Sequence, residues 1–245
     1  MKLVVSKFHD PSYNLALEEI LFSDMQDEFA LFYVNSPSVI IGCNQILQNE
    51  VDEDLCRVNN IPVIRRISGG GAVYHDLGNL TYSFIRNKID KAHNLNTEFL
   101  NSVVYALKSI GVEAVIGKRK DLWLPDGFKI SGTAAHLTAK RVLYHGTLLY
   151  NTDLSILNNS LSSPNKKTDV KGIQSVPSPV KNIKSFLEEN NLPIFNTSDF
   201  YKIIIRNIKD FCHISEEFHI DERFTSKIET SMKEKYLNNN WNKKK

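Results

Sequence analysis

The chain has 245 residues, of which 42% are hydrophobic and 24% are charged, and its formal net charge is +2. This composition is typical of a folded domain, and so small a charge gives no reason to expect nucleic acid or an anionic membrane as a partner. Three widely spaced cysteines, Cys43, Cys56 and Cys212, fit neither a disulfide framework nor a zinc knuckle. The sequence shows no targeting signal and no apolar run near the roughly 20 residues of a membrane span. Together with the unpaired pattern of cysteines, this predicts a reducing, cytoplasmic setting.

The N-terminal part predicts a helix that starts at a proline. Asp10 is a suitable N-cap residue and Pro11 a suitable first helical residue. A leucine-rich side then recurs at helical spacing, while Glu18 and Glu19 fall on the opposite side. The helix is therefore expected to pack by its leucine side and to leave both glutamates outside the core.

Further elements follow from apolar runs and from the turn residues between them. Strands are expected at residues 30–34, 38–42, 61–64, 72–75, 79–85, 112–116, 128–131 and 143–150, the first two flanking a turn at 35–37. Helices are expected at 51–58, 96–110, 183–189, 200–211 and 222–237, with loops at 86–96 and 161–169 and a frayed tail at 238–245. Because many strands come in pairs instead of alternating with helices, we expect an α+β fold with a mixed, largely antiparallel sheet flanked by helices.

Three adjacent glycines, Gly69 to Gly71, follow the pair Arg65 and Arg66. Adjacent glycines cost stability unless the backbone needs positive φ or a close approach by another group. Arginines supply fixed charge with bidentate geometry for phosphate or carboxylate, and bare backbone N–H groups complete an anion cradle. The pattern predicts a phosphate-binding loop between strands, although it has neither of the two common glycine-rich nucleotide motifs. A glycine-rich hairpin with surface arginines is the alternative.

Lys129 alternates with Phe128 and Ile130 in a strand-like run. A lysine within an apolar strand is uncommon, because its charge must be paired or must reach an anion. Next to an arginine-flanked glycine loop, it suits a nucleotide phosphate. An edge-strand lysine that points into water is the alternative.

Several segments, taken together and in this order, carry a resemblance to a known family. They are Asp10-Pro11 with Asn14-Leu15-Ala16-Leu17-Glu18-Glu19; Ile41-Gly42 with Asn44-Gln45 and Asn49; Arg65-Arg66-x-Ser68-Gly69-Gly70-Gly71-Ala72-Val73-x-His75-Asp76-x-Gly78-Asn79; Asp121-Leu122; Lys129-Ile130-Ser131-Gly132-x-Ala134; His145-Gly146-Thr147-Leu148-Leu149; and Lys171-Gly172-Ile173-x-Ser175-Val176. The chain resembles the lipoate–protein ligase A family over nearly all of residues 10–183.

The resemblance implies a fold like the catalytic domain of biotin ligases and class II aminoacyl-tRNA synthetases. It implies that ATP, with Mg²⁺, activates lipoate to lipoyl-AMP, and that the lipoyl group then passes to a lysine. The implied acceptors are lipoyl domains of 2-oxoacid dehydrogenase E2 subunits and the glycine-cleavage H protein. No nucleic acid or membrane partner is implied.

By position, the resemblance implies catalytic roles for Lys129, which would contact both lipoate and phosphate, and for Asp121, which would hold Mg²⁺ or the incoming amine. The implied binding residues for ATP or the adenylate are Arg66, Ser68, Gly69, Gly70, Gly71, Ala72, Val73, Tyr74, His75, Asn79, Lys129, Gly132, Ala134 and His145. A lysine between the lipoate carboxylate and the α-phosphate would stabilise charge on both. For His75 and His145, a hydrogen-bonded structural role is the alternative.

The chain departs from the family pattern at four positions. Lys120 stands where asparagine is common, Cys43 where a basic residue is common, and Pro177 and Pro179 where arginines are usual. These changes bear on substrate affinity more than on the type of reaction. Residues 1–245 are expected to form one catalytic domain, a short form with a helical part at about 183–240 and no C-terminal accessory domain. Either a separate small accessory protein then completes the enzyme, or the chain mainly transfers a lipoyl group that is already activated and activates lipoate itself only slowly. A transfer-only lipoyltransferase that uses preformed lipoyl-AMP is the alternative.

Other functions remain open at this point. An octanoyltransferase of the same fold would work through a cysteine thioester and would need an activated thiolate. A degenerate module that only binds lipoyl domains would have little reason to keep the glycine loop beside paired arginines. Biotin ligation is a weaker alternative, because the basic glycine loop typical of biotin ligases is absent.

Overall fold

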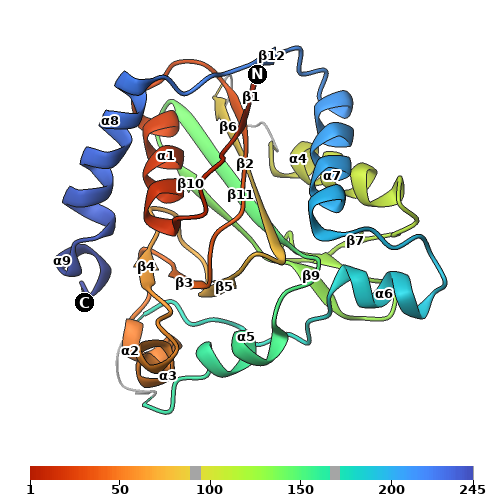
Figure 1. The fold of residues 1–245 in the computed structure, drawn as a ribbon, viewed down its shortest axis with the longest axis horizontal. Coiled ribbons are helices and arrows are strands. Elements are labelled where there is room, and N and C mark those ends of the chain that lie inside the picture. The colour runs from red at the N-terminus through yellow and green to blue at the C-terminus, as the bar shows by residue number, and fades with distance from the viewer. Residues whose placement is uncertain (89–94, 166–171, 245) are drawn as a thin grey trace.

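A six-stranded sheet forms the centre of the computed structural model, which describes residues 1–88, 95–165 and 172–244. In sheet order its strands are β10 (Thr133–Leu137), β11 (Arg141–Leu149), β6 (Asn79–Asn87), β2 (Phe29–Tyr33), β1 (Lys2–Val5) and β12 (Glu216–Glu217). Neighbouring strands are antiparallel except at β1, which is parallel to both β2 and β12. The long pair β6 and β11 runs through the middle of the molecule (Figure 1).

Two three-stranded sheets flank the central one. The first is ordered β4 (Val63–Arg65), β3 (Ser38–Ile41), β5 (Val73–His75), and the second β7 (Val115–Ile116), β8 (Leu122–Trp123), β9 (Lys129–Ser131). These sheets confirm the predicted α+β class with a mixed, mainly antiparallel arrangement. β2 and β3, which flank the predicted turn at 35–37, lie in different sheets, and β4 and β5 each pair with β3 instead of with each other. The hairpin alternative for the glycine-rich stretch is therefore wrong.

Helices lie on both faces of the central sheet and beside the smaller sheets. They are α1 (Pro11–Ser23), α2 (Leu47–Glu50), α3 (Glu53–Val58), α4 (Leu95–Lys108), α5 (Leu154–Ser160), α6 (Ile183–Glu189), α7 (Thr197–Phe211), α8 (Glu222–Ser231), the π-helix η1 (Met232–Tyr236) and α9 (Asn239–Asn242). Figure 1 shows α4 and α7 on one side of the sheet and α1 and α8 on the other. Parts of the expected loops at 86–96 and 161–169 lie outside the described residues. No helix of the described ranges is both long and apolar enough to cross a bilayer.

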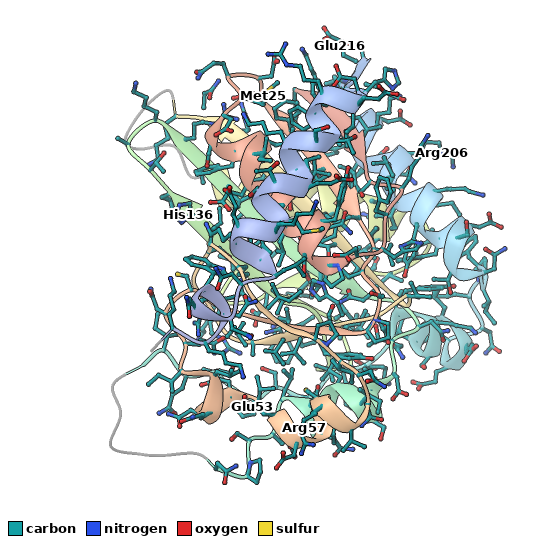
Figure 2. The ribbon with its side chains drawn as sticks, turned by 60° about the vertical axis from the view of Figure 1, so that its left-hand side comes forward. Met25, Glu53, Arg57, His136, Arg206 and Glu216 are labelled. Carbon is teal, nitrogen blue, oxygen red and sulfur yellow. The ribbon has the colours of Figure 1, made fainter. Side chains whose placement is uncertain are left out.

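Two hydrophobic cores arise because successive side chains of a strand point to opposite faces. In β2, Ala30 and Phe32 join the core under α4 and α7, whereas the alternate residues Phe29, Leu31 and Tyr33 join the core under α1. A third cluster fills the space between the β4-β3-β5 sheet and α5. The charged side chains of α3 stay outside these cores, as the outward positions of Glu53 and Arg57 illustrate (Figure 2).

The first helix is more deeply buried than its amphipathic pattern predicts. Asp10 caps it as expected, with Oδ1 accepting from the backbone N–H of Tyr13 at 2.9 Å. Its outer face is covered in turn by α8 and η1, which cross it in Figure 2. Glu18 is 1% exposed because its carboxylate points to the central sheet, where it meets Tyr33, Ser83 and His145. The prediction that it lies outside the core is therefore wrong.

The C-terminal segment also differs from expectation. The helix predicted at 222–237 ends as α8 and continues as η1, and the residues after it fold back as α9. Asn242 is buried, and Nε1 of Trp241 donates to the backbone oxygen of Arg65 at 2.7 Å. The expected frayed tail is therefore wrong for the described residues up to 244, and this segment is bonded to β4.

Candidate active site

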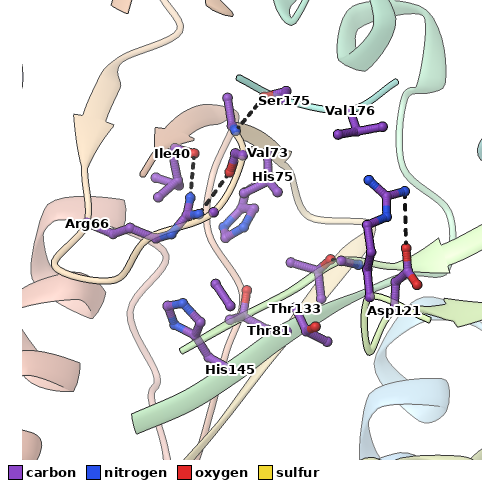
Figure 3. Close-up of a pocket in the computed structure, with 18 of the residues that line it drawn as sticks. Ile40, Arg66, Val73, His75, Thr81, Asp121, Thr133, His145, Ser175 and Val176 are labelled. Carbon is purple, nitrogen blue, oxygen red and sulfur yellow. Dashed lines mark hydrogen bonds and ion pairs between the residues drawn. The ribbon is translucent and has the colours of Figure 1, made fainter. Parts of the chain in front are cut away.

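A cavity of about 270 Å³ lies between the loop that joins β4 to β5 and the strands β9, β10 and β11. Figure 3 shows Arg66 and His75 on its glycine-loop side, and Thr133 and His145 on the opposite side. Most residues predicted from the sequence line it together: Arg66, Gly70, Gly71, Ala72, Val73, His75, Asp121, Lys129, Gly132, Ala134 and His145. The fold thus collects segments that are up to 79 positions apart along the chain, from Arg66 to His145.

Four predicted site residues do not line the cavity. Tyr74 packs in the third core, since it alternates with cavity-lining neighbours along β5. Asn79 donates from Nδ2 to the backbone oxygen of Tyr74 at 3.2 Å and so braces the turn before β6. Ser68 is fully buried, and the backbone oxygen of Gly69 accepts a hydrogen bond from Arg66. Their side chains act on the shape of the site, and ligand contacts by them stay a prediction.

The buried guanidinium of Arg66 shapes the glycine loop from within. Nη1 donates to the backbone oxygen of Ile40 at 3.0 Å, and Nη2 donates to those of Gly69 at 2.5 Å and Gly71 at 2.8 Å. Burial lowers the pKa of Arg66 to about 10, partly offset by the charge of Glu18, so the group stays cationic at neutral pH. Arg66 therefore adds positive charge to the cavity while most of its N–H groups hold protein oxygens.

The loop itself depends on two glycines. Gly70 has a φ of 86°, which L side chains rarely adopt. At the end of β3, a β-carbon added to Gly42 would lie only 2.2 Å from the backbone oxygen of Gly70. The glycine loop thus rests directly on the backbone of β3.

Arg65 does not face the cavity, although it precedes Arg66. Its side chain is fully buried, and its three nitrogens donate to six backbone oxygens, those of Gly42, Cys43, Gln45, Trp241, Asn242 and Lys244. The expectation that both arginines face an anion is wrong for Arg65. Its function is to fasten the C-terminal segment to the strand that leads into the glycine loop.

A buried hydrogen-bond relay leads from α1 to the same loop. The carboxylate oxygens of Glu18 each lie 3.1 Å from Nδ1 of His145. Nε2 of His145 lies 2.7 Å from the hydroxyl of Ser68, which accepts from Nε of Arg66 at 2.8 Å. Burial by itself raises the pKa of Glu18, but His145 and the hydroxyl of Ser83 hold it below its ordinary value. The relay therefore links the carboxylate of Glu18 to the guanidinium of Arg66 through the side chains of His145 and Ser68.

Lys129 brings a second positive charge to the cavity. Its Nζ lies 3.2 Å from Oδ2 of Asp121, and Nη2 of Arg119 lies 3.5 Å from the same oxygen. Burial raises the pKa of Asp121, but the hydrogen bond from Trp123 and the charge of Lys129 outweigh it and keep the group ionised. Because Lys129 lines the cavity, the alternative of a lysine that points into water is wrong.

The residues do not fit a protein-held magnesium ion. Within the described ranges, no group of three or more His, Cys, Asp or Glu side chains could hold a metal. Asp121 is a single carboxylate that already faces two cations. Magnesium usually keeps several waters and binds one or two carboxylates together with substrate phosphates. Magnesium in this cavity would therefore take its ligands from water and from the phosphates of the nucleotide.

Three buried polar atoms of cavity-lining residues lack hydrogen-bond partners among the described residues. They are Nε2 of His75, Oγ1 of Thr81 and Oδ2 of Asp121, of which the last is paired with the charges of Lys129 and Arg119. Unpaired buried polar groups are uncommon and costly, so they mark places where a ligand can form hydrogen bonds.

Ser175 ties a third segment to the glycine loop. Its hydroxyl accepts from the backbone N–H of Ala72 at 3.0 Å and from Nε2 of Gln45 at 3.1 Å. Its own N–H donates to Oε2 of Glu50 at 3.0 Å. The neighbouring Ile173 and Val176 extend this side of the cavity with exposed apolar side chains. The rest of the predicted motif, Lys171, lies outside the described residues.

The sequence reasoning did not assign Glu18, Thr81, Arg119 or Gly42 to the site. Periodicity placed Glu18 on a surface, and nothing local distinguishes Thr81 within a β-strand. Arg119 lies in the basic stretch Lys118-Arg119-Lys120, and nothing in that stretch shows which side chain reaches the site. For Gly42 the available signal was a glycine at a strand end, where backbones often approach closely.

No cysteine of the described residues lines the cavity. Burial raises the pKa of Cys56 to about 11, and burial also raises the pKa of Cys212. An activated thiolate needs the opposite shift. The placement of these thiols gives no support to a cysteine thioester mechanism.

Comparison with known proteins identifies the family. The lipoyl protein ligase A/B catalytic domain matches residues 10–209. Lipoate-protein ligase LplJ of Bacillus subtilis is 39% identical over 239 residues, which cover 96% of this chain and 70% of that protein. A crystal structure of lipoate-protein ligase A bound with ATP has a TM-score of 0.83 at 28% identity, covering 99% of this chain and 98% of the other. A bi-partite lipoate protein ligase of Thermoplasma acidophilum, studied with its E2 lipoyl domain, has a TM-score of 0.82 at 28% identity, covering 99% and 95%. These matches confirm the resemblance seen in the sequence motifs: the chain belongs to the lipoyl protein ligase A/B catalytic-domain family.

Proposed function

We propose that this chain is a lipoate–protein ligase, which activates lipoate with ATP and transfers the lipoyl group to a lysine of an acceptor protein. The observation that carries the proposal is the position of Lys129, whose ammonium group lies in the cavity beside the glycine loop and 3.2 Å from Asp121. Relatives named for lipoate and a relative structure bound with ATP support the choice of substrates.

In the first half-reaction, an oxygen of the lipoate carboxylate attacks the α-phosphorus of ATP. The new bond forms lipoyl-AMP, and the bond from the α-phosphorus to the bridging oxygen breaks, so that pyrophosphate leaves with the electron pair. Both partners are anionic, and a preorganised cation between them lowers their repulsion and stabilises the charge of the transition state. Lys129 is the side chain proposed for this place, with Arg66 adding charge from behind the loop.

In the second half-reaction, the acceptor lysine amine attacks the carbonyl carbon of lipoyl-AMP. The bond from that carbon to the phosphate oxygen breaks, AMP leaves with the electron pair, and the proton that the amine loses passes to solvent. Asp121 is proposed to attract the incoming amine, because its carboxylate is ionised and lies beside Lys129. Enclosure of the adenylate in the cavity also protects it from hydrolysis.

The finer parts of the function are part of the proposal. Lipoyl domains of 2-oxoacid dehydrogenase E2 subunits and the glycine-cleavage H protein are the proposed acceptors, supported by the relative studied with an E2 lipoyl domain. Magnesium is proposed to enter with the nucleotide phosphates. A reducing compartment such as the cytoplasm suits the three unpaired cysteines.

The test is ATP/pyrophosphate exchange with the chain alone, run in parallel with lipoate, octanoate and biotin. We expect exchange with lipoate and none with biotin, followed by AMP release when a lipoyl domain is added. An octanoate signal equal to that of lipoate would broaden the substrate class to medium-chain acids. The absence of exchange with all three acids would contradict the proposal, unless adding lipoyl-AMP still modified the acceptor, which would support a transfer-only enzyme. The same assay tests the expected accessory protein, since none is added.

A further inference from the structure

Two buried asparagines connect α1 to the imidazole of His75. Asn14 and Asn35 are both fully buried. Nδ2 of Asn14 donates to the backbone oxygen of Phe8 at 2.9 Å and to Oδ1 of Asn35 at 2.8 Å. Nδ2 of Asn35 lies 2.9 Å from Nδ1 of His75. Three side chains from α1, from the segment after β2 and from β5 thus form one chain of hydrogen bonds.

The donor and acceptor at each of these hydrogen bonds follow from the contact of Asn14 with a backbone oxygen. A backbone carbonyl can only accept, so the Asn14 atom that faces Phe8 must be the amide nitrogen. The same nitrogen then donates to Asn35, whose oxygen is the acceptor and whose nitrogen faces His75. Nδ1 of His75 must therefore accept. Because a neutral imidazole has one donor and one acceptor, the proton of His75 is on Nε2.

Nε2 is the ring nitrogen of His75 that this hydrogen-bond chain leaves free, and His75 lines the cavity. It is buried and has no hydrogen-bond partner among the described residues, while the residue as a whole is 3% exposed. Figure 3 shows the ring near Arg66, Thr81 and His145, around the same space. Burial, followed by the charges of Arg66 and His145, lowers the pKa of His75 to about 3, so the ring is neutral at working pH.

We propose that Asn35 is a positioning residue that fixes His75 as the neutral Nε2–H tautomer, and that this N–H donates to an oxygen of the acyl-adenylate. The acyl carbonyl and the non-bridging phosphoryl oxygens share the required chemistry, that of an acceptor on a reacting group. A neutral donor beside Arg66 avoids the repulsion that an imidazolium would meet there, and it stabilises developing negative charge without a proton transfer. The identity of the ligand rests on the proposed function, whereas the tautomer does not.

The tautomer is measured directly by ¹⁵N NMR of the full chain labelled at histidine, with His75→Gln to assign the signal. We expect a protonated Nε2 and an unprotonated Nδ1, with no titration between about pH 6 and 8. A protonated Nδ1, or a cationic ring at pH 7, would overturn the inference. This result does not depend on activity, so it stands or fails separately from the proposed function.

Asn35→Asp tests the relay, because it keeps the shape of the side chain but offers only acceptors to His75. We expect Nδ1 to gain a proton and the kcat of pyrophosphate release to fall about tenfold or more, with the KM for lipoate nearly unchanged. A spectrum like that of the unmodified protein would show that Asn35 does not set the tautomer.

Two substitutions of His75 test whether an N–H donor is needed at the place of Nε2. The amide nitrogen of glutamine can reach the place of Nε2, whereas that of asparagine can reach only the place of Nδ1. His75→Asn should lower kcat by about 10²–10³, and His75→Gln should recover at least tenfold of that loss. Equal losses in the two folded variants would overturn the donor role.

Discussion

Gly42→Ala tests how closely the glycine loop must be held against β3. A β-carbon at residue 42 would lie 2.2 Å from the backbone oxygen of Gly70, 3.2 Å from its carbonyl carbon and 3.3 Å from that of Gly69. All three are backbone atoms, so no side-chain rotation relieves the contact. The loop must retreat by about 1 Å before the carbon and the oxygen reach an ordinary van der Waals distance.

A shift of this size is large for an active site. Misplacing a catalytic constellation by about 1 Å can lower the rate about 10²-fold. The loop carries Gly70 and Gly71 at the cavity wall, so we expect Gly42→Ala to slow lipoate-dependent ATP/pyrophosphate exchange by about that factor. Over-packing should also lower the free energy of unfolding by about 1–3 kcal/mol.

Gly69→Ala is the matched control, since it adds the same methyl group to the glycine loop itself. Nothing lies within 4 Å of a β-carbon there, and the residue has no positive φ. We expect an unchanged melting temperature and a much smaller loss of exchange. Exchange at the unmodified rate in Gly42→Ala, or an equal loss in Gly69→Ala, would refute the argument from crowding.

Lys129→Ala should slow lipoate-dependent pyrophosphate release by about 10²–10³ without changing the unfolding curve; release near the original rate would show that Lys129 is not the catalytic cation. Arg65→Met should lower the free energy of unfolding, measured in urea, by at least about 2 kcal/mol, because buried carbonyl oxygens lose their donor; a smaller change would mean that other donors replace it. The pKa of His75 is depressed to about 3, so its neutral burial stabilises the fold fully above about pH 6.5 and progressively less as the pH falls. The slope is at most about 1.4 kcal/mol per pH unit, and His75→Gln should remove it from urea titrations at pH 7 and 5; equal slopes would contradict the buried neutral ring. Serine in place of all three cysteines should leave lipoyl transfer intact, whereas its full loss would favour the thioester alternative.

Local signals were enough to predict many elements of the fold. The start of α1 follows from Asp10 and Pro11, and Gly111 follows the end of α4 as expected for a helix stop. The helix α6 has the predicted bounds, 183–189. These features depend on backbone preferences within a few residues, which the sequence states directly.

Strand partners could not be predicted in the same way. Apolar runs identify β2, β3, β4 and β5, but the choice of partner depends on which surfaces the complete chain brings together. β3 joins β4 and β5 across intervening segments, so the two strands that flank the predicted turn at 35–37 lie in different sheets. Register and pairing are properties of the whole core, and no local window contains them.

The sequence also could not predict which charged side chains face the cavity. The residue types of the glycine loop and Lys129 predict anion chemistry, and the structure places them around one cavity. The adjacent arginines nevertheless diverge, because the strand alternates and only Arg66 turns inward. Arg65 meets partners about 176 positions later in the chain, and Glu18 meets His145 across 127 positions. No spacing rule foresees such contacts.

The bonds between Arg65 and the segment around Trp241 set an order of events during synthesis. The two residues are separated by 176 positions, and ribosomes add roughly 5–20 residues per second. Roughly 10 to 35 s therefore pass between the emergence of Arg65 and that of the carbonyl groups that its guanidinium binds. Until then, the strand that leads into the glycine loop holds a cation without half of its acceptors. The nascent chain can form most of its central sheet during this interval, but Arg65 gains its full set of acceptors only after residues 241–244 have been made.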